Sequence, residues 1–310
     1  MTTESNQALY GTSSMVAPLT RVAMRKPGKA LLNADSKKWH YAKDLNATKL
    51  AEQYQRFTDL VSGAGCEILW ISDEDDGLAD SVFTYDPSFM TPAGAIILKP
   101  GKSLREPEAQ LHQAFYQDQN IPIIGILESP GKFEGGDCFW LDDITLAVGR
   151  GFRTNIEGVK QVRTILEPQG INVLDFDLPV YKGSEACLHL MSVVSPLAEK
   201  VALVYAPLMP TALYQLMQEM GYLLIEAPED EFEASLGLNL NVLATAPKHC
   251  IAVDGFPKTQ ALMREAGCEV ITFQADELCI PCEGGPTCMT RPILRQNNLQ
   301  NSHKNSPQNS

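Results

Sequence analysis

Residues 250–272 read CIAVDGFPKTQALMREAGCEVIT, and the order of signals in this stretch decides the predicted fold. An apolar strand over 250–253 is broken by glycine, and a helix follows over 257–266. Gly267 ends the helix, and a second strand covers 269–272. The same order of strand, Pro or Gly break, helix and strand occurs five times along the chain, and a glycine stops the helix in four of these units. The chain is therefore predicted to be built from a repeated unit.

The five predicted helices begin near residues 47, 105, 156, 210 and 257, at intervals of 58, 51, 54 and 47 residues. Periods of this size are typical of repeat architectures, in which one unit cannot bury its apolar face alone. An open doubly wound α/β sheet also alternates strands and helices, but no helix opens with the G-x-G-x-x-G pattern of a dinucleotide site. We therefore predict an α/β fold in which five units close into a ring. The segments that join one unit to the next would then meet on its axis.

The composition of the 310 residues is that of a globular protein with a sizeable core, because 44% are hydrophobic and 20% are charged. The net charge of −13 argues against a nucleic acid or an anionic membrane as partner, since both require a basic surface. No apolar run approaches the ~18 residues that span a bilayer, and the polar N-terminus lacks the apolar core of a secretion signal. Eight scattered cysteines fit free thiols in the cytoplasm better than a disulfide scaffold.

We divide the chain into a flexible N-terminal segment over 1–12, a single α/β domain over 13–295 and a disordered tail over 296–310. The tail reads QNNLQNSHKNSPQNS and has too few apolar residues to bury the surface that ordering requires. We expect the protein to be a monomer or a homodimer.

The last joining segment is EGGPTCMT, residues 283–290, in which two glycines and a proline shape a tight loop with Cys288 at its exit. An unpaired cysteine is most often a small buried hydrophobic residue. A thiol presented by a loop can instead be a nucleophile, and cysteine enzymes pair it with a histidine far away in sequence. His189, in the apolar run CLHLM, is the candidate partner, and a satisfied core histidine is the alternative.

Carboxylates occur in two of the other joining segments. Asp80 and Asp86 flank apolar residues and are expected to be partly buried, where a carboxylate needs a partner such as a cationic ligand. Glu134 precedes Gly135-Gly136 and two aromatic residues. This pattern predicts either an acid held close to a planar group or a glycine-rich hairpin turn.

Arg105 and Arg153 lie at predicted helix starts, where a cation opposes the helix dipole. A two-pronged contact with the carboxylate of a ligand would explain both positions. Acids for a cation and arginines for an anion together predict a small zwitterionic ligand with a cationic end, similar to an amino acid.

The spacing Cys279-x-x-Cys282, with Cys288 nearby, is shared by zinc sites and redox pairs. A zinc site would need a second pair or closely spaced histidines, and a thioredoxin-type pair would open a helix. The sequence meets neither condition, so we predict no metal and no cofactor.

Taken together, these residues resemble the guanidino-group-modifying enzymes of the pentein superfamily, and most closely the dimethylarginine dimethylaminohydrolases. The resemblance covers about residues 13–295. The motifs that carry it are Pro18-Leu19-Thr20-Arg21-Val22, Asp80-Ser81-Val82-Phe83, Lys99-Pro100-Gly101 with Arg105, Glu134-Gly135-Gly136-Asp137, Arg153-Thr154-Asn155, His189-Leu190 and Thr287-Cys288. The fold of that family is a five-bladed α/β propeller with its site on the axis, which agrees with the repeat.

The resemblance implies covalent hydrolysis at the guanidinium carbon of arginine or an N-methylated arginine, without a cofactor. Cys288 matches the nucleophile of the family and His189 its general acid and base. Glu134 and Asp86 match carboxylates that hold the guanidinium nitrogens. The other implied substrate contacts are Asp80 at the amino-acid end, the backbone carbonyl of Cys282 at the amino group, and Arg105 and Arg153 at the carboxylate.

Two positions depart from the patterns of these families. Arginine deiminases carry an aspartate two residues after the histidine, where this chain has Met191. Many dimethylarginine hydrolases have Glu where it has Tyr85, which leaves the substrate open. The segment 31–42, with Trp39-His40-Tyr41, lies where the family has a mobile lid and would either set the substrate fit or pack. An amidinotransferase, an arginine deiminase and a non-catalytic binder of arginine derivatives are the alternatives.

Overall fold

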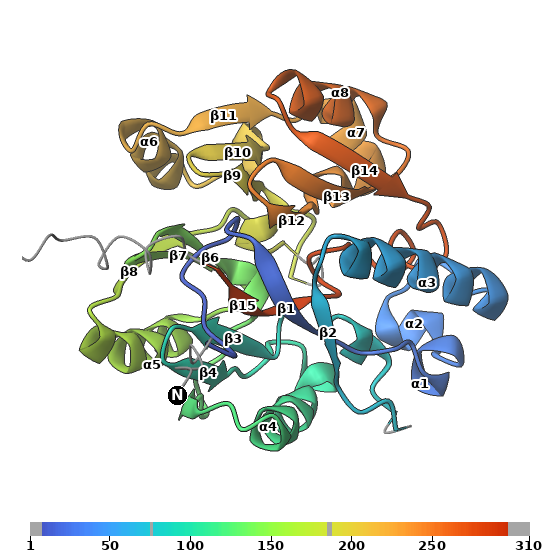
Figure 1. Ribbon diagram of the computed structural model, residues 1–310, viewed down its shortest axis with the longest axis horizontal. Coiled ribbons are helices and arrows are strands. Elements are labelled where there is room, and N and C mark those ends of the chain that lie inside the picture. The colour runs from blue at the N-terminus through green and yellow to red at the C-terminus, as the bar shows by residue number, and fades with distance from the viewer. Residues whose placement is uncertain (1–7, 75–76, 185–187, 297–310) are drawn as a thin grey trace, which may run out of the picture.

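The computed structural model describes residues 8–74, 77–184 and 188–296, and its elements follow the five-unit pattern (Figure 1). The unit around residues 250–272 shows how each blade is built. Strand β12 (Leu243–Ala246) pairs antiparallel with β13 (His249–Val253). Helix α8 (Pro257–Glu265) then crosses over to β14 (Glu269–Phe273), which pairs parallel with β13.

Three further blades repeat the order of antiparallel hairpin, helix and parallel strand. Their elements, blade by blade, are β3 (Ser88–Thr91), β4 (Gly94–Ile97), α4 (Glu108–Asp118) and β5 (Ile123–Ile126); β6 (Cys138–Asp142), β7 (Thr145–Arg150), α5 (Ile156–Leu166) and β8 (Asn172–Asp177); β9 (Val194–Ala198), β10 (Val201–Val204), α6 (Thr211–Glu219) and β11 (Leu223–Glu226).

The fifth blade combines strands from opposite ends of the sequence and closes the ring. Strand β1 (Leu19–Met24) is parallel to β2 (Glu67–Trp70) across helix α3 (Ala47–Gly63), and β15 (Arg291–Arg295) is antiparallel to β1. Gly11 forms a bridge to Leu294.

The two predicted end segments fall partly outside the described residues. Residues 8–12, which we expected to be flexible, are attached to the sheet through Gly11, whose N–H donates to the carbonyl of Ile293 at 2.7 Å. Residues 1–7 and 297–310, which include nearly all of the predicted disordered tail, lie outside the described part of the chain.

The protein is therefore a five-bladed α/β propeller, as predicted. The first strand of each blade (β3, β6, β9, β12 or β15) is buried almost throughout, whereas the last strand exposes part of its length. This gradient places the first strands around the axis and the last strands at the periphery. The crossover helices lie on the outside of the blades (Figure 1).

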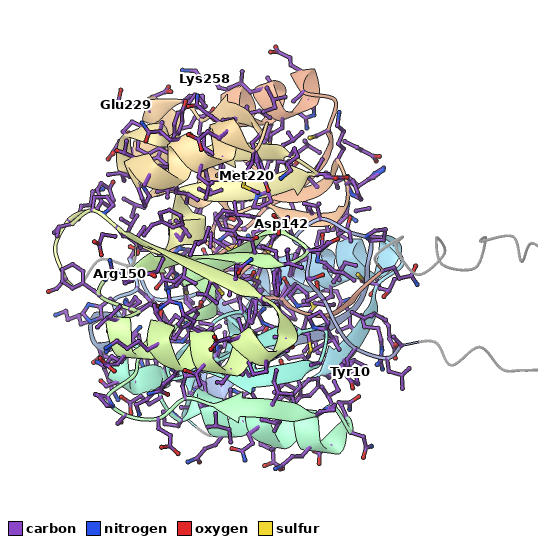
Figure 2. All side chains as sticks on the ribbon, turned by 90° about the vertical axis from the view of Figure 1, so that its left-hand side faces the viewer. Tyr10, Asp142, Arg150, Met220, Glu229 and Lys258 are labelled. Atoms are coloured by element: carbon purple, nitrogen blue, oxygen red, sulfur yellow. The ribbon has the colours of Figure 1, made fainter. Side chains whose placement is uncertain are left out.

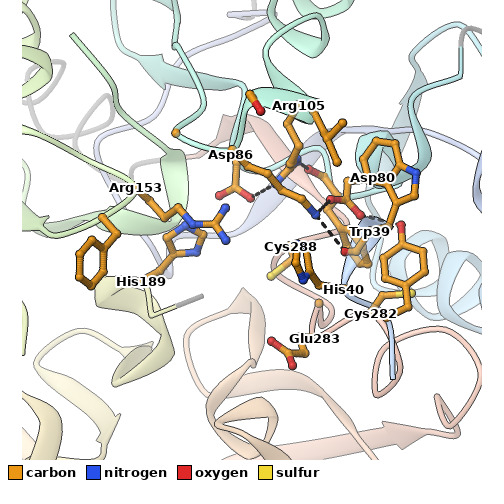
Figure 3. A pocket seen from close by; sticks show the side chains of 18 of the residues that line it. Trp39, His40, Asp80, Asp86, Arg105, Arg153, His189, Cys282, Glu283 and Cys288 are labelled. Carbon is orange, nitrogen blue, oxygen red and sulfur yellow. Dashed lines mark hydrogen bonds and ion pairs between the residues drawn. The ribbon is translucent and has the colours of Figure 1, made fainter. Parts of the chain in front are cut away.

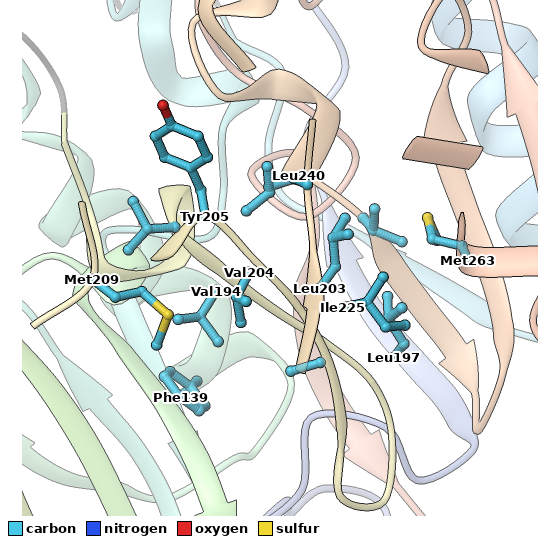
Figure 4. Close-up of a cluster of buried hydrophobic side chains, with 14 of the residues drawn as sticks. Phe139, Val194, Leu197, Leu203, Val204, Tyr205, Met209, Ile225, Leu240 and Met263 are labelled. Carbon is cyan, nitrogen blue, oxygen red and sulfur yellow. The ribbon is translucent and has the colours of Figure 1, made fainter. Parts of the chain in front are cut away.

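Apolar side chains fill the space between the blades. One cluster brings Phe139 of β6 together with Val194 of β9 and with Leu240, which lies in the segment that leads to β12 (Figure 4). Charged residues remain on the outer helices, where Figure 2 labels Lys258 of α8 and Glu229 of α7 (Glu229–Ser235). Lys258 pairs with Asp230 of α7 at 2.5 Å. None of the described helices combines the length and apolar character that crossing a membrane requires.

The predicted helix over 105–118 is split in the structure. A 3₁₀ turn, η2 (Ser103–Arg105), comes first, and α4 begins only at Glu108 because Pro107 stands before it. Two short helices, α1 (Lys29–Leu32) and α2 (Ser36–Trp39), occupy the lid segment. Arg105 therefore sits in a tight turn ahead of the helix.

Four of the five joining segments contain a 3₁₀ turn just before the first strand of the next blade. These turns are η1 (Ala79–Val82), η3 (Gly135–Asp137), η5 (Leu190–Ser192) and η7 (Leu238–Leu240). Glu134 and His189 cap the N-terminal ends of η3 and η5, and Asn241 caps the C-terminal end of η7. The pseudo-symmetry of the ring thus carries polar side chains from these three segments to the same region.

Candidate active site

The joining segments enclose a cavity of about 340 Å³ (Figure 3). Seven of the eight predicted site residues line it: Asp80, Asp86, Arg105, Arg153, His189, Cys282 and Cys288. The eighth, Glu134, is fully buried in contact with His189. The lid segment contributes Trp39, His40 and Tyr41 to the lining, so its aromatic residues face the ligand space.

The loop that presents Cys288 is held by close packing. A Cβ at Gly284 would overlap the ring of Phe83, and a Cβ at Gly285 would overlap the side chain of Asn241. These glycines are therefore required for close approach and not for a left-handed backbone. Asn241 accepts a hydrogen bond from the Thr287 N–H at 2.9 Å and donates from Nδ2 to the Sγ of Cys288 at 3.0 Å.

The surroundings of Cys288 favour the neutral thiol in the absence of a ligand. Burial is the main cause that raises the pKa of the thiol above its ordinary value of 9.0, and the negative charge of Asp86 adds to it. The Gly285 N–H, the Asn241 amide and His189 act in the opposite direction but do not outweigh burial. A bound cation would shift this balance toward the thiolate.

His189 and Glu134 form a buried pair, with Nε2 and Oε2 2.6 Å apart. The other carboxylate oxygen of Glu134 accepts hydrogen bonds from the N–H groups of Gly101 at 2.8 Å and Lys102 at 3.2 Å. Burial alone would raise the pKa of Glu134, but the hydrogen bond and charge of His189, with Arg153, hold it well below its ordinary value. Glu134 is therefore an anion that orients the imidazole.

Asp86 is fixed by two contacts. Its Oδ1 accepts from the Gly136 N–H at 2.9 Å, and its Oδ2 pairs with Nη1 of Arg105 at 2.6 Å. Arg105 is itself buried, and it also donates to both carboxylate oxygens of Glu108 and, at 2.8 Å, to the carbonyl of Phe83. In the structure Arg105 thus holds Asp86 in place, in addition to lining the cavity where a substrate carboxylate was expected.

Asp80 lies on the opposite side of the cavity from His189 and Arg153 (Figure 3). Its Oδ1 accepts a hydrogen bond from the hydroxyl of Tyr41 at 2.6 Å, and its Oδ2 pairs with Nζ of Lys102 at 2.6 Å. The carboxylate expected at the amino-acid end of the substrate is therefore engaged by a cation of the protein.

The remaining predicted residues lie at the edges of this arrangement. Arg153 lines the cavity with its Nη1 3.5 Å from Oε1 of Glu134. Cys282 is partly exposed and Cys279 is buried. Among the described residues, the one group with metal-ligand spacing is Asp86, Glu134 and His189, so Cys279 and Cys282 form no such cluster.

The sequence analysis did not identify three residues that contribute to the site. Asn241 belongs to the fourth joining segment, and the fivefold repeat itself was the signal that a polar residue there should reach the axis. Glu108 and Lys102 act through contacts with Arg105 and Asp80. Lys102 follows the Lys99-Pro100-Gly101 break, but nothing in the local pattern shows that its side chain turns into the cavity.

Comparison with known proteins agrees with the geometry. The family model described as N,N dimethylarginine dimethylhydrolase, eukaryotic, matches residues 23–295. The chain is 27% identical over 242 residues to the N(G),N(G)-dimethylarginine dimethylaminohydrolase of Pseudomonas aeruginosa, an alignment that covers 78% of this chain and 87% of that protein. It is 26% identical over 265 residues to the arginine deiminase of Listeria welshimeri, covering 72% and 63% of the two chains.

A solved structure shows the shared fold directly. It is that of a mutant dimethylarginine dimethylaminohydrolase from Pseudomonas aeruginosa, with serine in place of a cysteine, in complex with citrulline. The TM-score is 0.73 at 23% sequence identity, and the match covers 89% of this chain and all of that one. At this identity the match establishes the fold of the chain and leaves its substrate to be inferred from the site.

Proposed function

Because the chain belongs to the N,N-dimethylarginine dimethylhydrolase family, we propose that it hydrolyses the guanidinium group of an N-methylated arginine or a close relative. The products would be citrulline, or its analogue, and an alkylamine or ammonia. The observation that carries this proposal is the meeting of the Cys288 thiol, the His189–Glu134 pair and the Asp86 carboxylate around one cavity.

The first half of the proposed reaction forms a bond between Sγ of Cys288 and the guanidinium carbon. The bound cation favours the thiolate, and the thiol proton passes to His189. The thiolate attacks the carbon, and His189 returns the proton to the departing nitrogen. Cleavage of that C–N bond releases the amine and leaves a thiouronium on Cys288. The negative charges of Asp86 and Glu134 stabilise the positive charge, and Asp86, which lines the cavity, holds the planar group in place.

The second half of the reaction releases the ureido product. His189 takes a proton from water, which attacks the thiouronium carbon. The C–S bond breaks and the Cys288 thiolate leaves. The thiolate takes back the proton held by His189, and the remaining hydroxyl proton of the attacking water passes to the solvent, so that a neutral ureido product leaves and the thiol and the neutral imidazole are restored. Glu134 keeps the imidazole in one orientation through both halves. No step requires a metal or an organic cofactor.

One feature makes an arginine deiminase the weaker proposal: Met191 stands where arginine deiminases carry an aspartate, and it does not line the substrate cavity. Tyr85, which stands where many dimethylarginine hydrolases have Glu, packs its ring against the guanidinium of Arg291 at 3.8 Å, so the choice of substrate is left to the other residues of the cavity. We also propose a reducing, cytoplasmic location, since the cysteines in the described ranges are all free thiols.

The proposal is tested by incubating the purified full-length protein with N-methylated arginines, arginine and agmatine. Ureido product and released amine are quantified by mass spectrometry. We expect turnover in the wild type and in Cys268→Ser, whose thiol lies outside the cavity, and none in Cys288→Ser. Absence of a ureido product from every compound, or full activity of Cys288→Ser, would contradict the proposal. A guanidinated product formed with added glycine or ornithine would instead establish an amidinotransferase.

A further inference from the structure

The far end of the cavity, away from His189, is already neutralised by the protein. Both oxygens of Asp80 are used, one by the hydroxyl of Tyr41 and one by Nζ of Lys102, each at 2.6 Å. Asp80 is 5% exposed, so its pairing with Lys102 is shielded from water and costly to break. A substrate ammonium could reach Asp80 only by displacing Lys102.

Lys102 is held in this position at both ends. Its backbone N–H donates to the carboxylate of Glu134. Its Nζ also donates to the carbonyl of Trp39 at 3.1 Å and lies 5.1 Å from the centre of the Trp39 ring. An ammonium group has three N–H donors. Asp80 and the carbonyl of Trp39 accept from two of the donors of Lys102. We therefore expect the third donor to serve an acceptor in the cavity.

The other carboxylates that line the cavity offer no equivalent site for an ammonium. Asp86 lies at the other end of the cavity, where the proposed function assigns it to the guanidinium. Glu283 lines the cavity from a partly exposed position, where water screens its charge and weakens an ion pair. Within the described ranges 8–74, 77–184 and 188–296, the far end therefore presents a cation, Lys102, and no unpaired buried carboxylate.

We propose that Lys102 sets the substrate class, and that the cavity selects a guanidino compound whose far end is a carboxylate without a free ammonium beside it. An ω-guanidino acid, or an arginine acylated on its α-nitrogen, has this chemistry. The carboxylate would accept from Lys102, whereas an α-ammonium would be repelled by it. This inference rests on the proposed function for the guanidinium end of the substrate, and it specifies the charge that the other end of the substrate carries.

Three compounds that share the same guanidinium end separate the contributions of a carboxylate and of an ammonium at the far end of the ligand. Arginine carries both charges there, 5-guanidinopentanoate carries only the carboxylate, and agmatine carries only the ammonium. Calorimetric binding to the full-length Cys288→Ser protein gives their affinities without turnover, and kcat/KM is measured on the wild type. We expect 5-guanidinopentanoate to be preferred over arginine by about tenfold or more, and agmatine to be the weakest, because like charges across a contact oppose binding.

The variant Lys102→Met keeps most of the unbranched side chain, which becomes one atom shorter, and removes its charge. It should shift the preference toward arginine by about tenfold or more, because Asp80 becomes available to an ammonium. The control Lys99→Met removes a lysine of the same loop that pairs with Glu106 outside the cavity, and should leave the ratio unchanged.

Two outcomes would overturn the inference: tighter binding of arginine than of 5-guanidinopentanoate to the Cys288→Ser protein, or a ratio that Lys102→Met does not move. Failure of the proposed function looks different. In that case the ligands bind in the expected order, but no guanidine is converted to a ureido product.

Discussion

Asn241 connects the thiol to the loop that presents it: Nδ2 donates to Sγ of Cys288 at 3.0 Å, and Oδ1 accepts from the N–H of Thr287 at 2.9 Å. One side chain therefore fixes the loop and stabilises a charge on sulfur. Because a hydrogen bond to a charged group contributes about 1.5–3 kcal/mol, Asn241→Ala should lower kcat about 10- to 100-fold.

Asn241→Asp separates these two contributions. It keeps the acceptor for Thr287 but places a negative charge beside the sulfur. We expect it to preserve the melting temperature better than Asn241→Ala does, and to move the pH at which Cys288 is alkylated upward. Equal alkylation profiles for the wild type and Asn241→Asp would show that this hydrogen bond does not act on the thiolate.

The free enzyme should hold Cys288 as a thiol at neutral pH, because burial and Asp86 raise its pKa above 9.0. The thiolate absorbance at 240 nm, taken as the difference between wild type and Cys288→Ser, should therefore rise only above about pH 9. A saturating guanidinium ligand should move this rise to lower pH, since a nearby cation favours the thiolate. A thiolate signal at pH 7 without ligand would contradict this prediction.

Glu134→Gln should reduce both activity and acid-sensitive stability. Loss of the carboxylate that orients His189 should lower kcat by about 10²–10⁴-fold, the usual contribution of a positioned acid or base. Because the pKa of Glu134 is lower in the folded than in the unfolded chain, its stabilisation is present above pH 4.5 and is lost as the pH falls below that value. Urea unfolding at pH 3.5, 5 and 7 should show a smaller loss of stability with acid in the variant than in the wild type.

Gly136→Ala should displace the imidazole, because the added Cβ would lie 2.5 Å from Nδ1 of His189 and 3.0 Å from Oδ1 of Asp86. We expect a loss of about 1–3 kcal/mol in the free energy of unfolding, as for other overpacked sites, together with most of the activity. The control is Gly63→Ala at the end of α3, where no atom lies within 4 Å of the added Cβ. It should leave activity unchanged and stability equal or up to about 1 kcal/mol higher.

The repeat in the sequence predicted the parts of the fold that local signals determine. Helix α8 and its flanking strands lie within a residue or so of their predicted bounds, because glycines and a proline mark each boundary. The first strand of every blade escaped prediction. These strands are buried on both faces and lack polar alternation, and β9 and β15 contain Pro196 and Pro292, which argue against a central strand.

The repeat predicted which residues would lie at the site, but it did not predict which side chains would pair with them. Cys288, His189, Asp80 and Asp86 reach one cavity because they occupy equivalent joining segments. The pairing of Asp80 with Lys102, across 22 positions of sequence, depends on a side-chain direction that no periodicity encodes. The chemical roles of these residues remain predictions that the experiments above address.

The most direct test of the central claim is rapid acid quenching of the wild-type enzyme during turnover of an N-methylated arginine, followed by mass spectrometry of the peptide that contains Cys288. The proposed reaction predicts a transient increase equal to the substrate mass less that of the departing amine, carried on Cys288 and followed by citrulline. Steady formation of citrulline with no adduct at any quench time, or an adduct on another cysteine, would contradict nucleophilic catalysis by Cys288.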